Sequence, residues 1–166
     1  MKLLTTIITL GMTLACATKV EEVRTVKANG MTVQWYYANN RIHLELEAPT
    51  SGWVAIGFHN KPSLTGGYLV MGAVERKKIR VAEHYIHHPG HYQQIEELNG
   101  TNHIEMPDGE ETDRLTRIAF SLPLNIPSQY RKSLKAGQSY YLTLAYSRED
   151  NFQHHSVMRT SLFVTL

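Results

Sequence analysis

Two consecutive runs of alternating apolar and polar residues constrain the fold more than any other feature of this chain. In residues 41–48 every second residue is aliphatic: Ile42, Leu44 and Leu46. Residues 31–38 show the same period of two, and the Asn39-Asn40 pair between the runs tolerates the positive φ of a tight turn. Because a period of two puts one set of side chains on each face of a strand, residues 31–48 predict a β-hairpin with one buried and one solvated face.

The stretch SGWVAIGF, residues 51–58, has no polar alternate set. A strand of this composition is buried on both faces, so we expect it to be a central strand. Gly52 and Gly57 leave room where a backbone or a flat ligand approaches closely. The loop 59–67 follows, and residues 68–74 predict a second strand that is apolar almost throughout.

The rest of the chain predicts further strands separated by turn residues, at 79–86, 117–124, 139–146 and 159–166. The polar segment 87–113 is expected to hold one or two short strands at most, and residues 128–134 one short helical turn. The sequence has no sustained helical period, internal repeat or low-complexity segment. Many short strands with regularly spaced turns are typical of an all-β antiparallel sandwich.

Composition limits the functions that this chain can have. Its 166 residues suit one domain with a real core, and a net charge of +2 gives no electrostatic case for nucleic-acid binding. The single cysteine has no partner for a disulfide within a monomer, whereas nine histidines favour metal or haem chemistry. The sequence has no nucleophile motif, nucleotide-binding glycine loop or acid/base pair, so we expect a binding or electron-transfer module that is not an enzyme.

The N-terminus has the pattern of a targeting segment. An apolar run at residues 3–14 is too short to span a bilayer, and the motif TLAC that ends at Cys16 resembles a bacterial lipoprotein signal. In such proteins the cysteine becomes lipid-modified and N-terminal after cleavage. We therefore expect a signal peptide at 1–15, a tether at 16–26 and one domain at 27–166, anchored through Cys16 in the bacterial cell envelope and facing the periplasm or the exterior. The alternative is an ordinary secretory signal, with Cys16 removed or left as a free thiol.

In the order of these features the chain resembles the DOMON domain family, β-sandwich modules found in the cytochrome domain of cellobiose dehydrogenase and beside copper monooxygenase domains. The resemblance rests on four features: the strand of Trp35, the segment GWVAIGF at 52–58, the glycine-containing loop before 68–72, and His154-His155 before the last strand. It implies an immunoglobulin-like sandwich with Greek-key-type connections and a ligand pocket. Some members hold haem b between a methionine and a histidine, and others are thought to bind sugars or a metal ion.

The resemblance implies a haem ligand in the pair His154-His155, which lies where the family's haem histidine lies. Adjacent residues of an extended chain point in opposite directions, so we expect one of the two to face the pocket and the other to lie outside or to make a supporting hydrogen bond. Arg159 is a candidate partner for a haem propionate or another ligand carboxylate, and Trp53 is a candidate wall residue. The alternative is that the two histidines and Arg159 are surface residues.

The methionine ligand of the family falls on Leu64 or close to it in this chain. Leucine has no lone pair for an iron, which weakens the haem assignment directly. Three residues are candidates for its place: Met71 on the following strand, His59 in the same loop, and Met158. Each also has a plainer interpretation, since an interior methionine usually fills a gap in the core and a loop histidine is usually solvated.

A second histidine cluster comprises His84, His87, His88 and His91. The Pro89-Gly90 pair can fold His91 back toward His87 or His88, and such a group would suit Zn or Cu. Because no recognised zinc-binding spacing is present, the cluster is interpreted as solvated and adventitious.

Three functions remain open from the sequence. The preferred one is an envelope-anchored haem b module that passes single electrons to a redox partner protein. The second is a non-redox module for a carbohydrate or another small ligand. It is supported by aromatic residues whose faces can dock sugar rings: Trp35, Tyr36, Tyr37, Trp53, Tyr68 and Tyr92. The third is an interaction domain without a small ligand.

Overall fold

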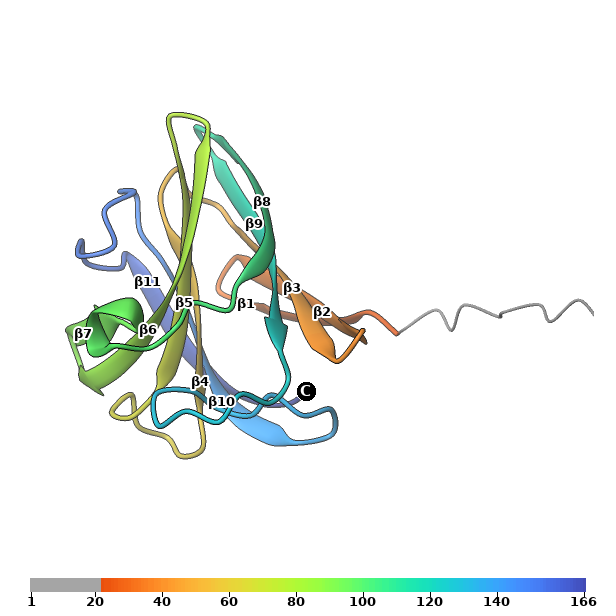
Figure 1. Cartoon of the computed structure of the whole chain (residues 1–166). Coiled ribbons are helices and arrows are strands. Elements are labelled where there is room, and N and C mark those ends of the chain that lie inside the picture. Colours follow the sequence, from red (N-terminus) through yellow and green to blue (C-terminus); the bar gives the residue numbers. More distant parts are fainter. Residues whose placement is uncertain (1–21) are drawn as a thin grey trace, which may run out of the picture.

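The computed structural model describes residues 22–166, which form two antiparallel β-sheets packed face to face (Figure 1). The expected signal peptide, the lipid attachment site at Cys16 and most of the expected tether lie outside the described residues. In the described part of the chain, no helix is long and apolar enough to cross a membrane.

The first sheet has five strands in the order β1-β2-β3-β9-β8. Their bounds are Arg24–Ala28 for β1, Met31–Ala38 for β2, Arg41–Ala48 for β3, Glu105–Thr112 for β8 and Leu115–Pro123 for β9. The second sheet has six strands in the order β11-β10-β4-β5-β6-β7. Their bounds are Val54–His59 for β4, Tyr68–Glu75 for β5, Lys78–His88 for β6, His91–Gln94 for β7, Ser139–Tyr146 for β10 and Met158–Thr165 for β11. A short 3-10 helix, η1 at Glu96–Leu98, follows β7.

The chain passes from one sheet to the other after β3, after β7 and after β9. All neighbouring strands pair in the antiparallel sense. The predicted all-β antiparallel sandwich is therefore confirmed.

The β2–β3 hairpin has the bounds that its alternation predicts. Val33 pairs with Leu46, and Asn39 and Asn40 form the turn with φ of 51° and 60°. The aliphatic residues at every second position of β3 are buried in the main core between the sheets. Gly72 on β5 allows the close approach of the opposite sheet, since a Cβ there would lie 2.6 Å from Ile118 Cγ2.

The six-stranded sheet is also covered on its outer face, the face turned away from the main core. All six positions of β4 are buried, as the apolar stretch at 51–58 predicts. The outward-facing residues belong to a second buried group, called here the outer cluster: Trp53, Ala55, Leu69, Met71, Ala73, Ala82, Ile86, Ala145 and Phe152. Most of these residues come from the sheet, and Phe152 comes from the segment 147–157 that joins β10 to β11.

The structure differs from the sequence-based expectations at three places. Arg24, Thr25 and Val26 of the expected tether belong to β1, because the free edge of β2 pairs with them. Residues 128–134 contain no helix; Leu134 N–H donates to the Leu124 carbonyl at 2.9 Å, and Arg131 pairs with Glu83 of β6. β8 is an eight-residue strand, longer than the short strands expected between residues 87 and 113.

Candidate functional site

The outer face of the six-stranded sheet has a floor of small side chains. The strand register places Ala55 between Ala145 and Met71, and Ala145 in turn beside Arg159. The next row across the same strands consists of Ser161, Thr143, Gly57 and Leu69. The small residues Ala145 and Ala55 at the centre of the first row leave space above the sheet between the longer side chains at its ends.

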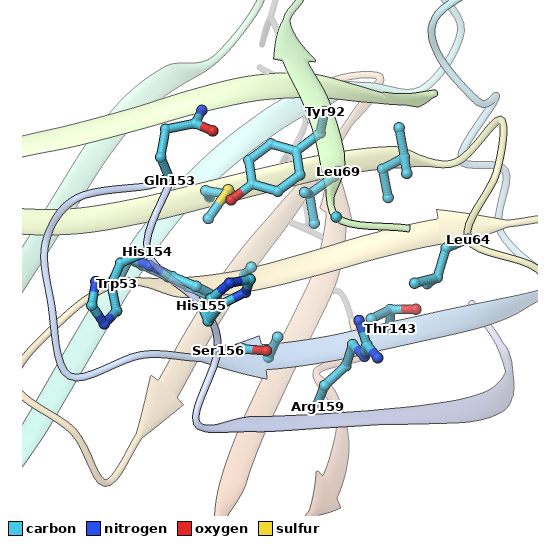
Figure 2. Close-up of a pocket in the computed structure, with 15 residues that line it drawn as sticks. Trp53, Leu64, Leu69, Tyr92, Thr143, Gln153, His154, His155, Ser156 and Arg159 are labelled. Atoms are coloured by element: carbon cyan, nitrogen blue, oxygen red, sulfur yellow. The ribbon is translucent and has the colours of Figure 1, made fainter. Parts of the chain in front are cut away.

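A pocket of about 120 Å³ lies above this floor (Figure 2). The sheet supplies its base, and the β6–β7 turn, the β4–β5 loop and the segment 147–157 supply its sides. The lining residues are Trp53, Ala55, Leu64, Leu69, Met71, Ile86, Gly90, Tyr92, Thr143, Ala145, Gln153, His154, His155, Ser156 and Arg159. The pocket therefore combines an apolar base with two imidazoles and one guanidinium.

Phe152 fixes the segment 147–157 to the outer cluster. The Phe152 side chain is 3% exposed, and the guanidinium carbon of Arg80 lies 3.9 Å from the centroid of its ring, within the range of a cation–π contact. Arg80 also donates to the Asp150 carbonyl at 2.6 Å. The His84 ring stands edge-on to Phe152, with 5.7 Å between centroids. These contacts bind the segment to β6.

The same segment is tied to the start of β4. Ser147 N–H donates to the Trp53 carbonyl at 2.9 Å, and Trp53 N–H donates to the Glu149 carbonyl at 3.1 Å. Within the segment, the Ser147 hydroxyl donates to the His155 carbonyl at 3.0 Å. A Cβ on Gly52 would lie 2.4 Å from Glu149 N, so only glycine fits there. The room that Gly52 leaves is therefore filled by backbone, and it helps to position the two histidines.

The pocket brings together six of the seven residues predicted to bind a cofactor: Trp53, Leu64, Met71, His154, His155 and Arg159. Met71 is buried as a core methionine would be, but it lies on the outer face and its side chain lines the pocket. Met158, the third candidate for the methionine position, packs against the main core between the sheets and does not line the pocket.

The expectation that only one of His154 and His155 faces the pocket is wrong, because both line it. The rule for extended strands does not apply here. The segment turns at this point, and His154 N–H donates to the Asn151 carbonyl at 2.9 Å. Both histidine side chains are exposed at the rim of the pocket.

The seventh predicted residue, His59, is buried and not a solvated loop residue. Its ring fills the space between two glycines: a Cβ on Gly57 would lie 2.9 Å from His59 Nε2, and one on Gly67 2.3 Å from Cε1. Nε2 lies 3.0 Å from the Thr143 hydroxyl. Burial and, secondly, the positive charge of Lys132 lower the pKa of His59, so this imidazole is neutral at pH 7. The room at Gly57 therefore serves a side chain of the protein itself.

His59 borders a second depression, called here the hollow, of about 160 Å³. The residues around it are His59, Lys61, Pro62, Ser63, Leu64, Tyr141, Thr143 and Ser161. Leu64 and Thr143 line the pocket as well, so the pocket and the hollow adjoin along the outer face.

The second histidine cluster divides into two parts. The His91 ring lies 5.2 Å from that of His87 and 4.8 Å from that of His88, so the predicted return of the chain at Pro89-Gly90 is confirmed. His84 lies on the outer side of the sheet but is buried, with only 1% of its surface exposed. Its interpretation as solvated is therefore wrong. Burial lowers the pKa of His84 to about 4. Among residues 22–166, no group of three or more His, Cys, Asp or Glu side chains is placed to hold a metal ion.

Most of the aromatic residues considered for sugar docking lie elsewhere. Trp35 and Tyr68 are buried in the main core, and Tyr36 belongs to the other sheet. Only Trp53 and Tyr92 of that set line the pocket. Aromatic content therefore gives little support to sugar binding at this site.

Sequence reasoning missed Phe152, Thr143 and the alanines of the floor. Phe152 is the one Phe, Tyr or Trp in the polar segment 147–157. This isolation is the signal that could have identified it as an anchor. The alanines on β4 and β10 carry no such signal, since their role depends on which strands become neighbours.

The fold and the pocket define a class of protein, a β-sandwich module that binds a ligand. The chain belongs to the DOMON domain family, whose model matches residues 27–147, so the predicted resemblance is confirmed. Among curated proteins there is no sequence match.

Two solved structures share the fold. The cytochrome domain of Myriococcum thermophilum cellobiose dehydrogenase has a TM-score of 0.61 at 10% identity, over 88% of this chain and 82% of that one. The cytochrome b domain of pyranose dehydrogenase from Coprinopsis cinerea has a TM-score of 0.60 at 12% identity, over 80% of this chain and 76% of that one. At such identities the likeness establishes the fold alone.

The chemical groups around the pocket fit a haem, but the space in this conformation does not. The rim carries two imidazoles, Met71 supplies a thioether, and the buried Trp53 Nε1 has no hydrogen-bond partner among the described residues. Leu64 lines the pocket and supplies no iron ligand. Pockets for cofactor-sized ligands usually measure about 300–1,000 Å³, so a macrocycle enters only if part of the rim moves outward.

Proposed function

We propose that this chain is a haem b module for electron transfer, with the haem in the outer-face pocket. The observation that carries the proposal is that the His154-His155 pair and Met71, which is far from the pair in the sequence, line one pocket above a floor of small residues. Imidazole and thioether groups are the ligands that hold haem iron in many cytochromes. The similar solved structures are named as cytochrome domains, which supports the same class of cofactor.

In this proposal one imidazole of the His154-His155 pair is the first iron ligand and Met71 is the second. Haem, when bound, supplies the single-electron chemistry. The chain's own residues hold the ligands in place and keep water away: Ser147 fixes the backbone at His155, and the apolar side chains of Leu69 and Ile86 wall the pocket. A dry, apolar surrounding is one of the means by which a protein sets a redox potential.

The rim histidines are the part of the site that moves most easily to admit the macrocycle. Gln153, His154 and His155 are exposed, whereas Phe152 immediately before them is buried. We therefore expect residues 153–156 to shift outward on binding while Phe152 stays in place.

The test is reconstitution of the purified protein with haem, followed by absorption spectroscopy in the oxidised and reduced states. The expected result is a Soret band that shifts on reduction, and its loss or displacement in one of the variants His154→Ala and His155→Ala. Met71→Leu is expected to change the spectrum of the oxidised protein. His88→Ala is the matched control, because His88 is also exposed near the rim but does not line the pocket.

Absence of bound haem after reconstitution would contradict the proposal. So would spectra of both histidine variants that equal the wild-type spectrum. Leu64 supports one alternative, in which the pocket binds an apolar planar ligand without coordinating a metal. That alternative predicts binding of a metal-free porphyrin and no dependence on either histidine.

We further propose that the module is anchored in the bacterial cell envelope through Cys16 and exchanges electrons with a redox partner protein. This proposal is supported by the lipoprotein-like sequence of residues 1–16. A lipid at Cys16 would keep the domain close to the membrane surface, because only a short segment separates Cys16 from the start of β1 at Arg24.

A further inference from the structure

We propose that the hollow beside the pocket is a subsite for carboxylate groups, so that the site accepts an apolar, planar ligand with an acidic end. This subsite rests on the proposed function, because that function places the ring system of the ligand in the pocket. It assigns a role to Lys61, Ser161 and Thr143, which the iron-binding proposal leaves without one.

The pocket and the hollow are continuous with each other. Leu64 and Thr143 border both the pocket and the hollow, and Thr143 stands in the row next to the alanine floor. Figure 2 shows Thr143 and Arg159 on the side of the pocket where Leu64 lies, with Trp53 and His154 on the opposite side. A ligand that lies on the floor therefore has one end at the rim histidines and the other end at the hollow.

The charged side chains that line the pocket and the hollow are positive. Among the described residues, neither the pocket nor the hollow is lined by an Asp or a Glu. Arg159 lines the pocket and Lys61 lines the hollow, and neither makes an ion pair within residues 22–166. Arg117 on the other sheet, by contrast, is paired with Glu45 at 3.1 Å. One such cation at each of two adjoining depressions, with no acid among the described residues that line them, favours an anionic group where the depressions meet.

The hollow is also lined by hydrogen-bond donors. Four residues that line the hollow carry hydroxyl groups: Ser63, Tyr141, Thr143 and Ser161. A carboxylate accepts up to about four hydrogen bonds, and hydrogen bonds from cations and hydroxyls are the ones that recognise it best. The pocket itself is apolar at its base, so it suits the body of the ligand and not its charged groups.

These features select a chemical class of ligand. The apolar floor accepts a flat ring system, and the hollow accepts one or two carboxylates at its edge. A porphyrin with its two propionates belongs to this class, and so does any planar aromatic acid of similar size. A neutral sugar does not, because it has neither a large apolar face nor an anionic end.

The test compares binding of metal-free protoporphyrin IX with that of its dimethyl ester in the same non-ionic detergent, measured by quenching of tryptophan fluorescence. The diacid is expected to bind at least about tenfold more tightly than the ester, since charge-assisted hydrogen bonds are the stronger kind. The double variant Lys61→Gln/Arg159→Gln should lose about tenfold in affinity for the diacid and keep its affinity for the ester. Both side chains are exposed, so the variant is expected to fold normally.

The matched control is the double variant Lys27→Gln/Arg114→Gln, which removes the same two charges from exposed positions of the five-stranded sheet and its β8–β9 turn. It should bind both compounds as the wild type does. Equal binding of diacid and ester, equal losses in the two double variants, or no binding of either porphyrin would each overturn the inference.

Metal-free porphyrin has no iron, so this result is independent of the axial ligands. If the diacid preference is found and haem shows no spectrum that depends on His154 or His155, the carboxylate subsite stands and the electron-transfer proposal fails. If haem is ligated but the ester of haem binds as tightly as the diacid, the electron-transfer proposal stands and the carboxylate subsite fails.

Discussion

The hydroxyl of Tyr92 donates a hydrogen bond to the backbone carbonyl of Phe152, which joins the β6–β7 hairpin to the segment that carries the rim histidines. Sixty positions separate the two residues in the sequence. Both flank the buried ring of His84, with centroids 5.5 Å and 5.7 Å away. The position of His154 and His155 therefore depends on a contact to another part of the sheet.

Phe152→Ala should release the segment 147–157 without unfolding the sandwich. Removal of a buried phenylalanine costs about 3–5 kcal/mol where the structure is fully cooperative, but a surface segment can detach locally. Amide hydrogen exchange at His154, whose N–H is bonded to the Asn151 carbonyl, should become faster while exchange in β4 and β10 stays slow.

The control for this prediction is Phe163→Ala, which removes a phenylalanine that is 67% exposed on β11. It should leave exchange at His154 unchanged. Unchanged exchange in the Phe152 variant would mean that other contacts hold the segment.

Stability should fall between about pH 6.5 and pH 4 because of His84. The pKa of His84 is lowered by burial from 6.5 to about 4, so in this range the unfolded chain binds a proton that the folded chain does not. The corresponding loss is about 3 kcal/mol on going from neutral pH to pH 4. His59, whose pKa is also lowered, acts in the same direction.

The variant His84→Leu should weaken this pH dependence, measured by urea unfolding at a series of pH values. His88→Leu is the control, since His88 is exposed, and its pH profile should match that of the wild type. Equal slopes for His84→Leu and the wild type would show that His84 is accessible to protons in the folded state.

A buried ion pair between Glu83 and Arg131 should be essential for the stability of the domain. Glu83 is fully buried; it accepts hydrogen bonds from Arg131 and from the Tyr68 hydroxyl, and from His103 N–H at 2.7 Å. Removal of one partner of a buried pair costs about 3–5 kcal/mol, because the other charge stays buried and unpaired. Arg131→Met should therefore lower the free energy of unfolding by that amount.

A double-mutant cycle checks the account of this pair. The variant Glu83→Gln/Arg131→Met should lose clearly less than the sum of the two single losses. In the half-exposed pair of Arg117 and Glu45, Glu45→Gln should cost less than about 1 kcal/mol. Additive losses at Glu83 and Arg131 would contradict a direct coupling.

Cys16→Ser should move the protein from the membrane fraction to the soluble fraction of bacterial cells. In the proposed anchoring, a lipid on this cysteine attaches the protein to the membrane, and serine has no thiol to carry that lipid. Fractionation of cells that express the wild type and the variant provides the measurement. The same distribution for both proteins would contradict the lipoprotein proposal.

Local pattern predicted the sheets well and the site only in part. The bounds of β2, β3 and β10 follow from their period of two, because a strand with one buried face has an apolar residue at every second position. The double burial of β4 could also be predicted from its composition. What covers its outer face could not, because Phe152 lies in a polar segment without a period.

The neighbours in the pocket depend on strand order as well as on sequence. Arg159, Ala145, Ala55 and Met71 lie in one row only because β11, β10, β4 and β5 are adjacent. The expectation for the histidine pair failed for a related reason, since it assumed an extended chain where the backbone turns. His59 was misjudged because its loop position does not show that the chain folds its ring into the space left by Gly57 and Gly67.

The most direct test of the central claim, that the ligand occupies the outer face of the six-stranded sheet, is an NMR titration of isotope-labelled protein with haem. We predict that paramagnetic broadening will remove the amide signals of Ala55, Met71 and Ala145, and leave those of Gln34 and Ala119 on the five-stranded sheet unchanged. Broadening centred on Gln34 and Ala119, or no broadening at Ala55 and Ala145, would contradict the account.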